Sequence, residues 1–376
     1  MPSSDHLERF AVELRDRLIE RRRAAIVSGD ERPVDMRASV REIVDQEAIV
    51  LSSAGRDRLL ERVLRDTVGL GPLEELMADP SVEEVLVNGH EDVYVERRGR
   101  LERVDLGFEG EGQLRDVIER VLAPIGRRVD ELSPMADGRL ADGSRVNVVI
   151  PPLAVDGPIL SIRRFGAVRP DPAELIRLGS IPAEAMGLLE AAIAARSNLL
   201  ISGGTGSGKT TVLNAISSFI AEGERVITIE DAAELRLRQA HVVRLESRPP
   251  GVEGTGAISI RDLVRNALRM RPDRLVIGEV RGAEAMDLLI ALNTGHRGAL
   301  STIHANGPQD AVARLETLAL MANLELPHSV VRDQIGRAVD IILHLERGPE
   351  GTRLATSIAE LHAEPGKIVV RELWSR

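Results

Sequence analysis

The first 65 residues have the hydrophobic pattern of amphipathic helices. Two helices are predicted at 36–51 and at about 55–68, after a polar break at 28–33. Before the break, four apolar positions recur at helical spacing among charged residues, at Leu7, Phe10, Leu14 and Leu18. We assign residues 1–65 to an N-terminal helical segment whose arginines and glutamates form a solvated face. A docking surface for a partner is the alternative.

Residues 66–165 show short strand-like runs separated by glycine turns. One helix is predicted at 114–126. Strands are predicted at 82–89, 92–99, 100–107, 145–150 and 159–165. Short strands with a single helix predict a small α+β domain, which we place at 66–165.

The pattern changes again after a stretch with two prolines, GAVRPDP, and we place a linker at 166–180. Beyond it, apolar runs alternate with helical patterns, at 197–202, 225–230, 274–278 and 299–303. Such continuous runs are typical of a mostly parallel sheet that is covered on both faces. Two more candidate strands, 340–346 and 367–373, close the chain. We therefore predict an α/β domain at 181–376.

The composition excludes several kinds of chemical site and argues against some partners. The 376 residues carry a formal net charge of -10 and include no cysteine, which excludes disulfides, thiolate zinc sites and cysteine nucleophiles. Aromatic residues make up 2%, whereas proteins that grip single-stranded nucleic acid usually stack bases on aromatic side chains. The charged start lacks the apolar core of a secretory signal, and no apolar run reaches the ~18–20 residues that span a bilayer. We expect a cytoplasmic protein that reaches a membrane through partners, and no nucleic acid as a partner.

Of the 49 basic residues only Lys209 and Lys367 are lysines, and Lys209 lies in the run GGTGSGKTT. This run matches G-x-x-x-x-G-K-[ST] between a predicted strand and a predicted helix. Such glycines let backbone N–H groups cradle phosphates, and a thin lysine stem fits where a guanidinium does not. We predict an ATP and Mg²⁺ site, in which Lys209 reaches the β- and γ-phosphates and Thr210 binds Mg²⁺. The predicted nucleotide-binding run is Gly203, Gly204, Thr205, Gly206, Ser207, Gly208, Lys209, Thr210 and Thr211.

Three more candidates stand at the carboxyl ends of predicted strands, where open α/β sheets bind ligands. Glu230 could orient or deprotonate the attacking water, or cap a helix. Glu279 could hold the metal's water shell or the attacking water, or be an exposed residue after a strand. His304 could hydrogen-bond the γ-phosphate and report its hydrolysis, or be structural.

Three arginines lie on predicted strands shortly before the linker, Arg145, Arg163 and Arg164. A nucleotide in a cleft between two domains or two subunits could be clamped by such side chains. The alternative is an ordinary surface role in an arginine-rich chain.

With these elements in order, the chain resembles the secretion ATPase superfamily, which powers type II and type IV secretion, type IV pili and archaella. It is most similar to the CpaF-like or TadA ATPases of tight-adherence (Flp) pilus assembly. The matching segments are 69–89, 135–165, GGTGSGKTT, TIEDAAEL and 242–306. The tetracysteine zinc element of some type II secretion ATPases is absent, as the lack of cysteine requires.

This resemblance implies a hexameric ring in which an N-terminal sensing domain is joined flexibly to a RecA-like ATPase domain. It implies that Glu230 lies in the Asp box, that Glu279 is the Walker B glutamate and a metal-site residue with Thr210, and that His304 is the His box. It also implies that Arg145 and Arg163 reach the nucleotide and that Arg281 lies near the site.

The function predicted on this basis is an ATP-hydrolysing motor for tight-adherence pilus assembly at the inner face of the cytoplasmic membrane. Its expected partners are further copies of itself, polytopic platform proteins of the membrane and, indirectly, pilin subunits. One alternative is a type IV secretion or conjugation ATPase, and another is a RecA-like nucleic-acid motor. A slowly hydrolysing assembly scaffold is a third.

Overall fold

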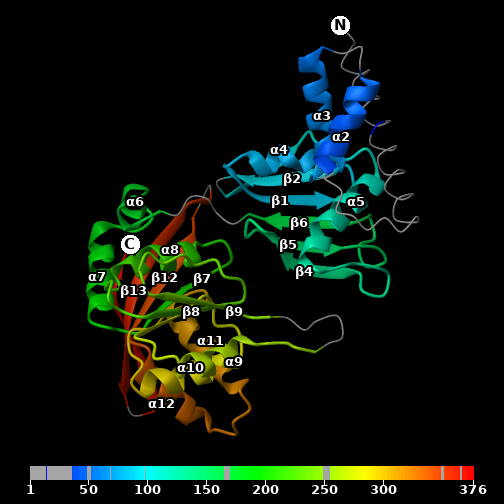
Figure 1. The fold of residues 1–376 in the computed structure, drawn as a ribbon. Coiled ribbons are helices and arrows are strands. Elements are labelled where there is room, and N and C mark those ends of the chain that lie inside the picture. Colours follow the sequence, from blue (N-terminus) through cyan, green and yellow to red (C-terminus); the bar gives the residue numbers. More distant parts are fainter. Residues whose placement is uncertain are drawn as a thin grey trace. The chain divides into compact units, whose positions relative to one another are not determined.

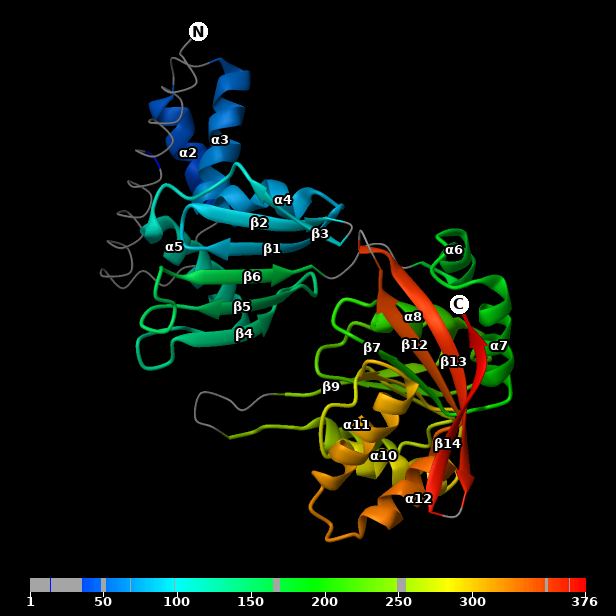
Figure 2. The ribbon, with the colours of Figure 1, turned by 180° about the vertical axis from the view of Figure 1, so that it is seen from behind.

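A computed structural model shows two compact units, residues 1–165 and 166–376, each with its own core (Figures 1 and 2). It describes residues 14, 36–48, 52–67, 69–97, 99–164, 170–248, 255–348, 351–364 and 366–376. The helix predicted around Leu7 lies outside the described residues, except for Leu14, which is buried. Within the described part of the chain, none of the helices combines the length and the apolar character needed to cross a bilayer.

The two helices predicted after the polar break are confirmed as α2 (Met36–Glu47) and α3 (Ser53–Thr67). Their apolar stripes pack against each other, because Val40, Ile43 and Val63 are buried in one cluster with Leu14. The helical segment is therefore held together by its own small hydrophobic core.

The rest of the first unit is a six-stranded antiparallel sheet with the order β3-β2-β1-β6-β5-β4. The buried face of this sheet packs on the apolar stripe of α5, and one core cluster joins them. The prediction missed β4, because its sequence MADGR is polar and contains a glycine. The elements are η1 (Gly71–Leu73), α4 (Glu74–Ala78), β1 (Val82–Asn88), β2 (Asp92–Arg97), β3 (Arg100–Val104), α5 (Glu111–Leu122), η2 (Ala123–Ile125), β4 (Met135–Arg139), β5 (Arg145–Val149) and β6 (Ile159–Arg163).

The second unit is built on an eight-stranded sheet with the order β14-β13-β12-β7-β11-β10-β8-β9. The six strands from β12 to β9 are parallel, and β13 and β14 add an antiparallel edge. The prediction missed β9 and β13, since neither is a continuous apolar run. The strands are β7 (Leu199–Gly203), β8 (Val226–Glu230), β9 (Val242–Glu246), β10 (Arg274–Ile277), β11 (Leu300–His304), β12 (Ile341–Arg347), β13 (Arg353–Glu364) and β14 (Lys367–Ser375).

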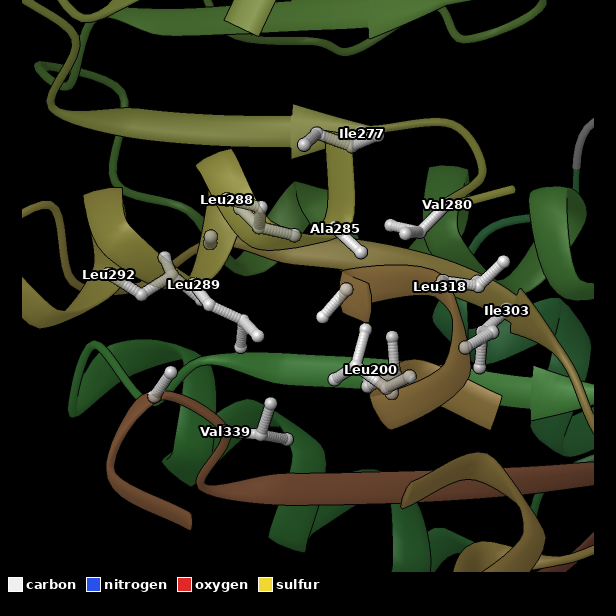
Figure 3. Close-up of a cluster of buried hydrophobic side chains, with 14 of the residues drawn as sticks. Leu200, Ile277, Val280, Ala285, Leu288, Leu289, Leu292, Ile303, Leu318 and Val339 are labelled. Atoms are coloured by element: carbon white, nitrogen blue, oxygen red, sulfur yellow. The ribbon is translucent and has the colours of Figure 1, made fainter. Parts of the chain in front are cut away.

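Helices cover both faces of this sheet, as the continuous apolar strands require. On one face pack α6 (Pro172–Arg177), α7 (Ala183–Ala194) and α8 (Lys209–Ile216), followed by η3 (Ser217–Phe219). The other face carries α9 (Ile260–Ala267), α10 (Glu284–Asn293), α11 (Pro308–Leu320) and α12 (His328–Ala338). Figure 3 shows the core beneath this second layer, where Leu200, Ile277 and Ile303 meet side chains of α10 and α11.

The predicted linker 166–180 contains the short helix α6. Asp171 caps it by accepting a hydrogen bond from the N–H of Glu174. Leu175 is 3% exposed and belongs to the core of the second unit. The part of the linker that the structure describes is therefore anchored to the core of the second unit from α6 onward.

Candidate active site

Four of the predicted elements meet at one edge of the parallel sheet. Because β7, β8, β10 and β11 run in the same direction, their carboxyl ends lie side by side. β7 ends at Gly203, β8 ends at Glu230, and Glu279 comes two residues after β10. His304 ends β11 and lies directly opposite Gly203 in the register. The structure therefore gathers at this edge the groups that the motifs predicted separately.

The glycine-rich run forms a tight loop between β7 and α8. A side chain at Gly203 would collide with the carbonyl oxygen of Leu345 on β12 and would lie 2.5 Å from Oγ of Ser207. The Ser207 hydroxyl donates to the carbonyl of Gly204 at 2.9 Å, which fixes the turn. Gly208 has a φ of 90°, a left-handed conformation that favours glycine, and it is the N-cap residue that precedes α8. This geometry brings the backbone N–H groups of a helix N-terminus to the loop.

Lys209 lies inside the loop, and the residue is only 7% exposed. Its Nζ donates to the carbonyl oxygens of Gly203 at 2.9 Å and Gly204 at 2.8 Å. Burial lowers the pKa of the ammonium, while the charge of Glu279 opposes that effect and Arg281 adds to it. Its hydrogen bonds go to neutral carbonyl groups, so the buried positive charge remains available to attract an anion.

Glu279 lies between the guanidinium of Arg281 and the imidazole of His304 at the same edge. Its Oε1 lies 3.1 Å from Nε2 of His304, and its Oε2 accepts a hydrogen bond of 2.7 Å from Arg281. Arg281 also approaches the exposed carboxylate of Asp231, with 3.6 Å between Nη1 and Oδ2. The hydrogen bond that Arg281 donates to Glu279 raises the pKa of the guanidinium. Arg281 therefore lies beside Glu279, and its contact with a nucleotide stays a prediction.

His304 is held in its neutral form more firmly than an exposed histidine. Burial lowers its pKa first, and the positive charge of Lys209 lowers it further, while Glu279 acts in the opposite direction. A neutral imidazole can donate one hydrogen bond and accept another. The side chain is therefore suited to connect Glu279 with a ligand bound near Lys209.

Glu230 accepts backbone hydrogen bonds, and its carboxyl group has a raised pKa. Its Oε2 accepts the N–H groups of Glu234 at 2.8 Å and Leu235 at 2.9 Å, in the loop after β8. Its Oε1 is buried and has no hydrogen-bond partner among the residues that the structure describes. Burial raises the pKa of this carboxyl to about 7. The helix-capping alternative is not what the structure shows, because a loop and no helix lies between β8 and β9, and Glu230 holds the backbone of that loop. Its role toward water stays a prediction.

Arg145 and Arg163 belong to the other unit, where they lie directly opposite each other on β5 and β6. The adjacent pair, Val146 and Ile162, points into the core, so the two arginines share the opposite face of the sheet. Glu84 on β1 is the partner of Arg163 on its other side. Like charges directly opposite each other on paired strands are destabilising. The contact of Arg145 and Arg163 with a nucleotide stays a prediction.

Two further arginines contact the loop and escaped the prediction. The guanidinium of Arg347, at the end of β12, lies against Gly206, and the stem of Arg353, at the start of β13, lies against Gly208. A signal for Arg347 was present in the sequence, since it follows a buried strand in the same way as Glu230 and His304. Arg353 gave no such signal, because its strand was not predicted.

The side chains present fit ATP and Mg²⁺. The loop is closed by glycines at positions where a Cβ would meet neighbouring atoms, and its lysine is buried within it. A hydroxyl from Thr210 and a carboxylate from Glu279 are oxygen ligands of the kind that Mg²⁺ prefers, with phosphates and water completing its shell. When bound, Mg²⁺ would neutralise charge that develops on the phosphates.

Comparisons with known proteins identify the family of the chain. The family model of type II/IV secretion system proteins matches residues 66–361. The chain is 39% identical over 320 residues to a protein of Mycobacterium tuberculosis that is named, provisionally, for conjugal transfer, covering 83% of this chain and 90% of that protein. It is 35% identical over 300 residues to the conjugal transfer protein TrbB of Rhizobium radiobacter, covering 78% and 88%. The chain therefore belongs to the type II/IV secretion system family and is one of its ATPases.

Solved structures support the fold. The ATPase DotB of Legionella pneumophila is similar with a TM-score of 0.57 at 22% identity, over 80% of this chain and 81% of DotB. The pilus retraction motor PilT, solved with bound ADP, is similar with a TM-score of 0.55 at 19% identity, over 80% and 82%. At this identity the likeness concerns the fold alone, and it confirms the predicted RecA-like ATPase domain with a smaller N-terminal domain.

Proposed function

We propose that this secretion ATPase hydrolyses ATP to ADP and phosphate and uses the free energy to assemble a tight-adherence (Flp) pilus. The observation that carries the hydrolase assignment is the group formed by Lys209, Glu279, Arg281 and His304 at the carboxyl edge of the sheet. The pilus assignment rests on the resemblance of segments 69–89, 135–165 and 242–306 to the ATPases of that system.

In the proposed reaction each side chain has a separate task. Lys209 binds the β- and γ-phosphates, and Thr210 and Glu279 hold Mg²⁺. Glu279 also orients the attacking water, and His304 binds the γ-phosphate and is coupled to Glu279 through their 3.1 Å contact. Glu230, with a pKa of about 7, can accept a proton at neutral pH. Arg281 stabilises negative charge that develops on the phosphates.

Mechanical work requires that the N-terminal unit responds to the nucleotide. We propose that Arg145 and Arg163 contact it and so favour a closed arrangement of the two units, which opens after hydrolysis. Six copies would act in turn around a ring and move a polytopic platform protein at the inner face of the cytoplasmic membrane. Pilin subunits would then enter or leave the membrane through that platform.

A second candidate function is conjugation or type IV secretion. It is supported by the names of relatives, which include the conjugal transfer protein TrbB and the type IV secretion system protein PtlH of Bordetella pertussis. In that case the same ATPase cycle would act on a secretion channel in place of a pilus platform.

The two candidates are separated by capture of partners in the native cell. A tagged Glu279→Gln variant is expected to bind ATP without turning it over, and is purified from gently solubilised membranes. Small pilin-like chains with a polytopic protein support the pilus motor, and a conjugation or secretion complex supports the second candidate. The control is the same variant with Lys209→Ala, which should lose partners whose binding depends on nucleotide. Rapid ATP hydrolysis by Glu279→Gln would refute the role of Glu279.

A further inference from the structure

The hairpin formed by β12 and β13 passes beside the glycine-rich loop. β12 pairs with β7 in parallel, and Leu345 is the partner of Gly203, the last residue of β7. β12 continues for two residues beyond this point, to Arg347. β13 begins at Arg353, which is the antiparallel partner of Arg347. Both strands thus extend an arginine past the point where β7 turns into the loop.

These two arginines contact the loop in different ways. A Cβ placed on Gly206 would lie 3.3 Å from Nη1 of Arg347, so the guanidinium itself lies over the middle of the loop. A Cβ placed on Gly208 would lie 3.2 Å from Cδ of Arg353, so the aliphatic stem covers the end of the loop. Arg347 is exposed and Arg353 is half-buried. The hairpin therefore presents a solvent-accessible charge and a packing surface to the same loop.

The charges around this loop indicate what Arg347 could bind. Lys209 is buried in the loop, and the charges of Lys209 and Arg281 both lower the pKa of His304, while Glu279 opposes them. Arg347 adds a cation to a region that already holds two, and such an arrangement favours an anion with several negative oxygens. A guanidinium can form paired hydrogen bonds to phosphate oxygens.

We infer that the β12–β13 hairpin forms a second wall of the nucleotide site, in which Arg347 binds the phosphate chain of a nucleoside di- or triphosphate. Arg353 is a positioning residue, because its stem holds Gly208 and hence the start of α8. This inference rests on the proposed ATPase function. It adds to the known loop motif a phosphate contact from a segment about 140 residues further along the chain, as the separation of Gly206 and Arg347 shows.

The test is the dissociation constant of MgADP for the full-length chain, measured by titration at low and high salt. Arg347→Gln should raise it about tenfold, as expected for loss of a hydrogen bond to a charged group. Arg347→Lys keeps the charge and should raise it less. The wild type should lose more affinity at high salt than Arg347→Gln does. Arg371→Gln is the matched control, because Arg371 is exposed on β14 of the same sheet, and it should stay within about twofold of wild type.

Arg353 is tested by separating its stem from its charge. Arg353→Met keeps a long apolar side chain over Gly208 and should keep MgADP affinity within about threefold. Arg353→Ala removes the stem and should weaken binding by more than Arg353→Met does. Equal affinities for the two variants would refute the positioning role.

Other outcomes overturn the inference about Arg347. An unchanged dissociation constant for Arg347→Gln, while Lys209→Ala abolishes binding, refutes the phosphate contact and leaves the ATPase function intact. Equal weakening in Arg347→Gln and Arg347→Lys, with a lower melting temperature of both ligand-free variants, shows a merely structural role. A wild-type chain that binds no MgADP refutes the ATPase function and this inference together.

Discussion

Charged groups at the amino ends and at the carboxyl ends of the parallel strands differ in how completely they are neutralised. We call these two ends of the sheet the amino edge and the carboxyl edge. At the amino edge, Arg274 begins β10 and is 2% exposed. Its guanidinium binds both carboxylate oxygens of Glu224, at 2.7 Å and 3.1 Å, and the carbonyls of Gly298 and Ile193. Asn198, just before β7, is equally well satisfied, since its amide bonds the backbone at Ala338, Gly298 and Ala299. Here the buried charge of Arg274 is neutralised by Glu224.

At the carboxyl edge the charges are incompletely neutralised. Lys209 is bound by neutral carbonyls, and Glu230 keeps a buried oxygen that has no partner among the described residues. The pKa values of Lys209 and His304 are lowered, and that of Glu230 is raised. Buried polar groups are normally satisfied, so incompletely neutralised groups at this end of the sheet are candidates for binding a ligand.

The largest effect is expected for Lys209→Ala. Loss of the buried ammonium should lower ATP turnover by about a thousandfold, since electrostatic stabilisation of the transferred phosphate disappears. Thermal stability should change little. Lys367→Ala is a matched control, because the only other lysine is 64% exposed and pairs with Glu364 on the last hairpin. Near-normal turnover in Lys209→Ala would refute the assignment of the site.

Arg274→Ala should have the opposite signature, with a large effect on folding. It leaves Glu224 and two backbone carbonyls without their buried partner, which should cost about 3–4 kcal/mol in the free energy of unfolding. Turnover per folded molecule should stay near that of wild type. Arg196→Ala removes the exposed partner of the same carboxylate and should cost at most about 1 kcal/mol. Denaturant titrations measure both, and equal losses would contradict the comparison.

Glu230→Gln should reveal the raised pKa through pH-dependent stability. A carboxyl whose pKa rises from 4.5 to about 7 on folding carries no penalty below pH 4.5 and the full penalty above pH 7. The stability of Glu230→Gln relative to wild type should therefore increase with pH across this window, by roughly 3 kcal/mol at most.

The matched control is Glu246→Gln, at the register partner of Glu230 on the exposed edge strand β9. Its stability difference from wild type should show no comparable rise between pH 4.5 and pH 7. The measurement is a series of unfolding titrations in this range. A stability difference for Glu230→Gln that stays constant with pH would show that this carboxyl is not perturbed.

The smallest effect concerns the first unit. Arg163→Ala should leave the affinity for ATP within about twofold and lower turnover by about tenfold, if this arginine acts only after the units close. Arg103→Ala is the control, since Arg103 is 62% exposed on β3 of the same sheet and pairs with Asp92. Full turnover in Arg163→Ala would remove this residue from the active site.

The sequence by itself determined the elements whose signals are local. The strand, glycine loop and helix around Lys209 are consecutive, so the loop could be predicted from its motif. Buried strands appear as continuous apolar runs, so the positions of Glu230, Glu279 and His304 at or just after strand ends could be predicted as well. Polar or interrupted strands such as β4, β9 and β13 gave no comparable signal, because pairing with neighbours holds them in the sheet.

Only the tertiary structure decided how the strand ends are combined. The order of strands in the sheet places His304 beside Gly203 and brings Leu345 against the same glycine, over separations of more than 100 residues. Burial of Glu230 and the contact of Arg347 with the loop follow from that order. A residue's own neighbours in sequence set its propensity, whereas its solvation and its charged surroundings depend on segments that are remote along the chain.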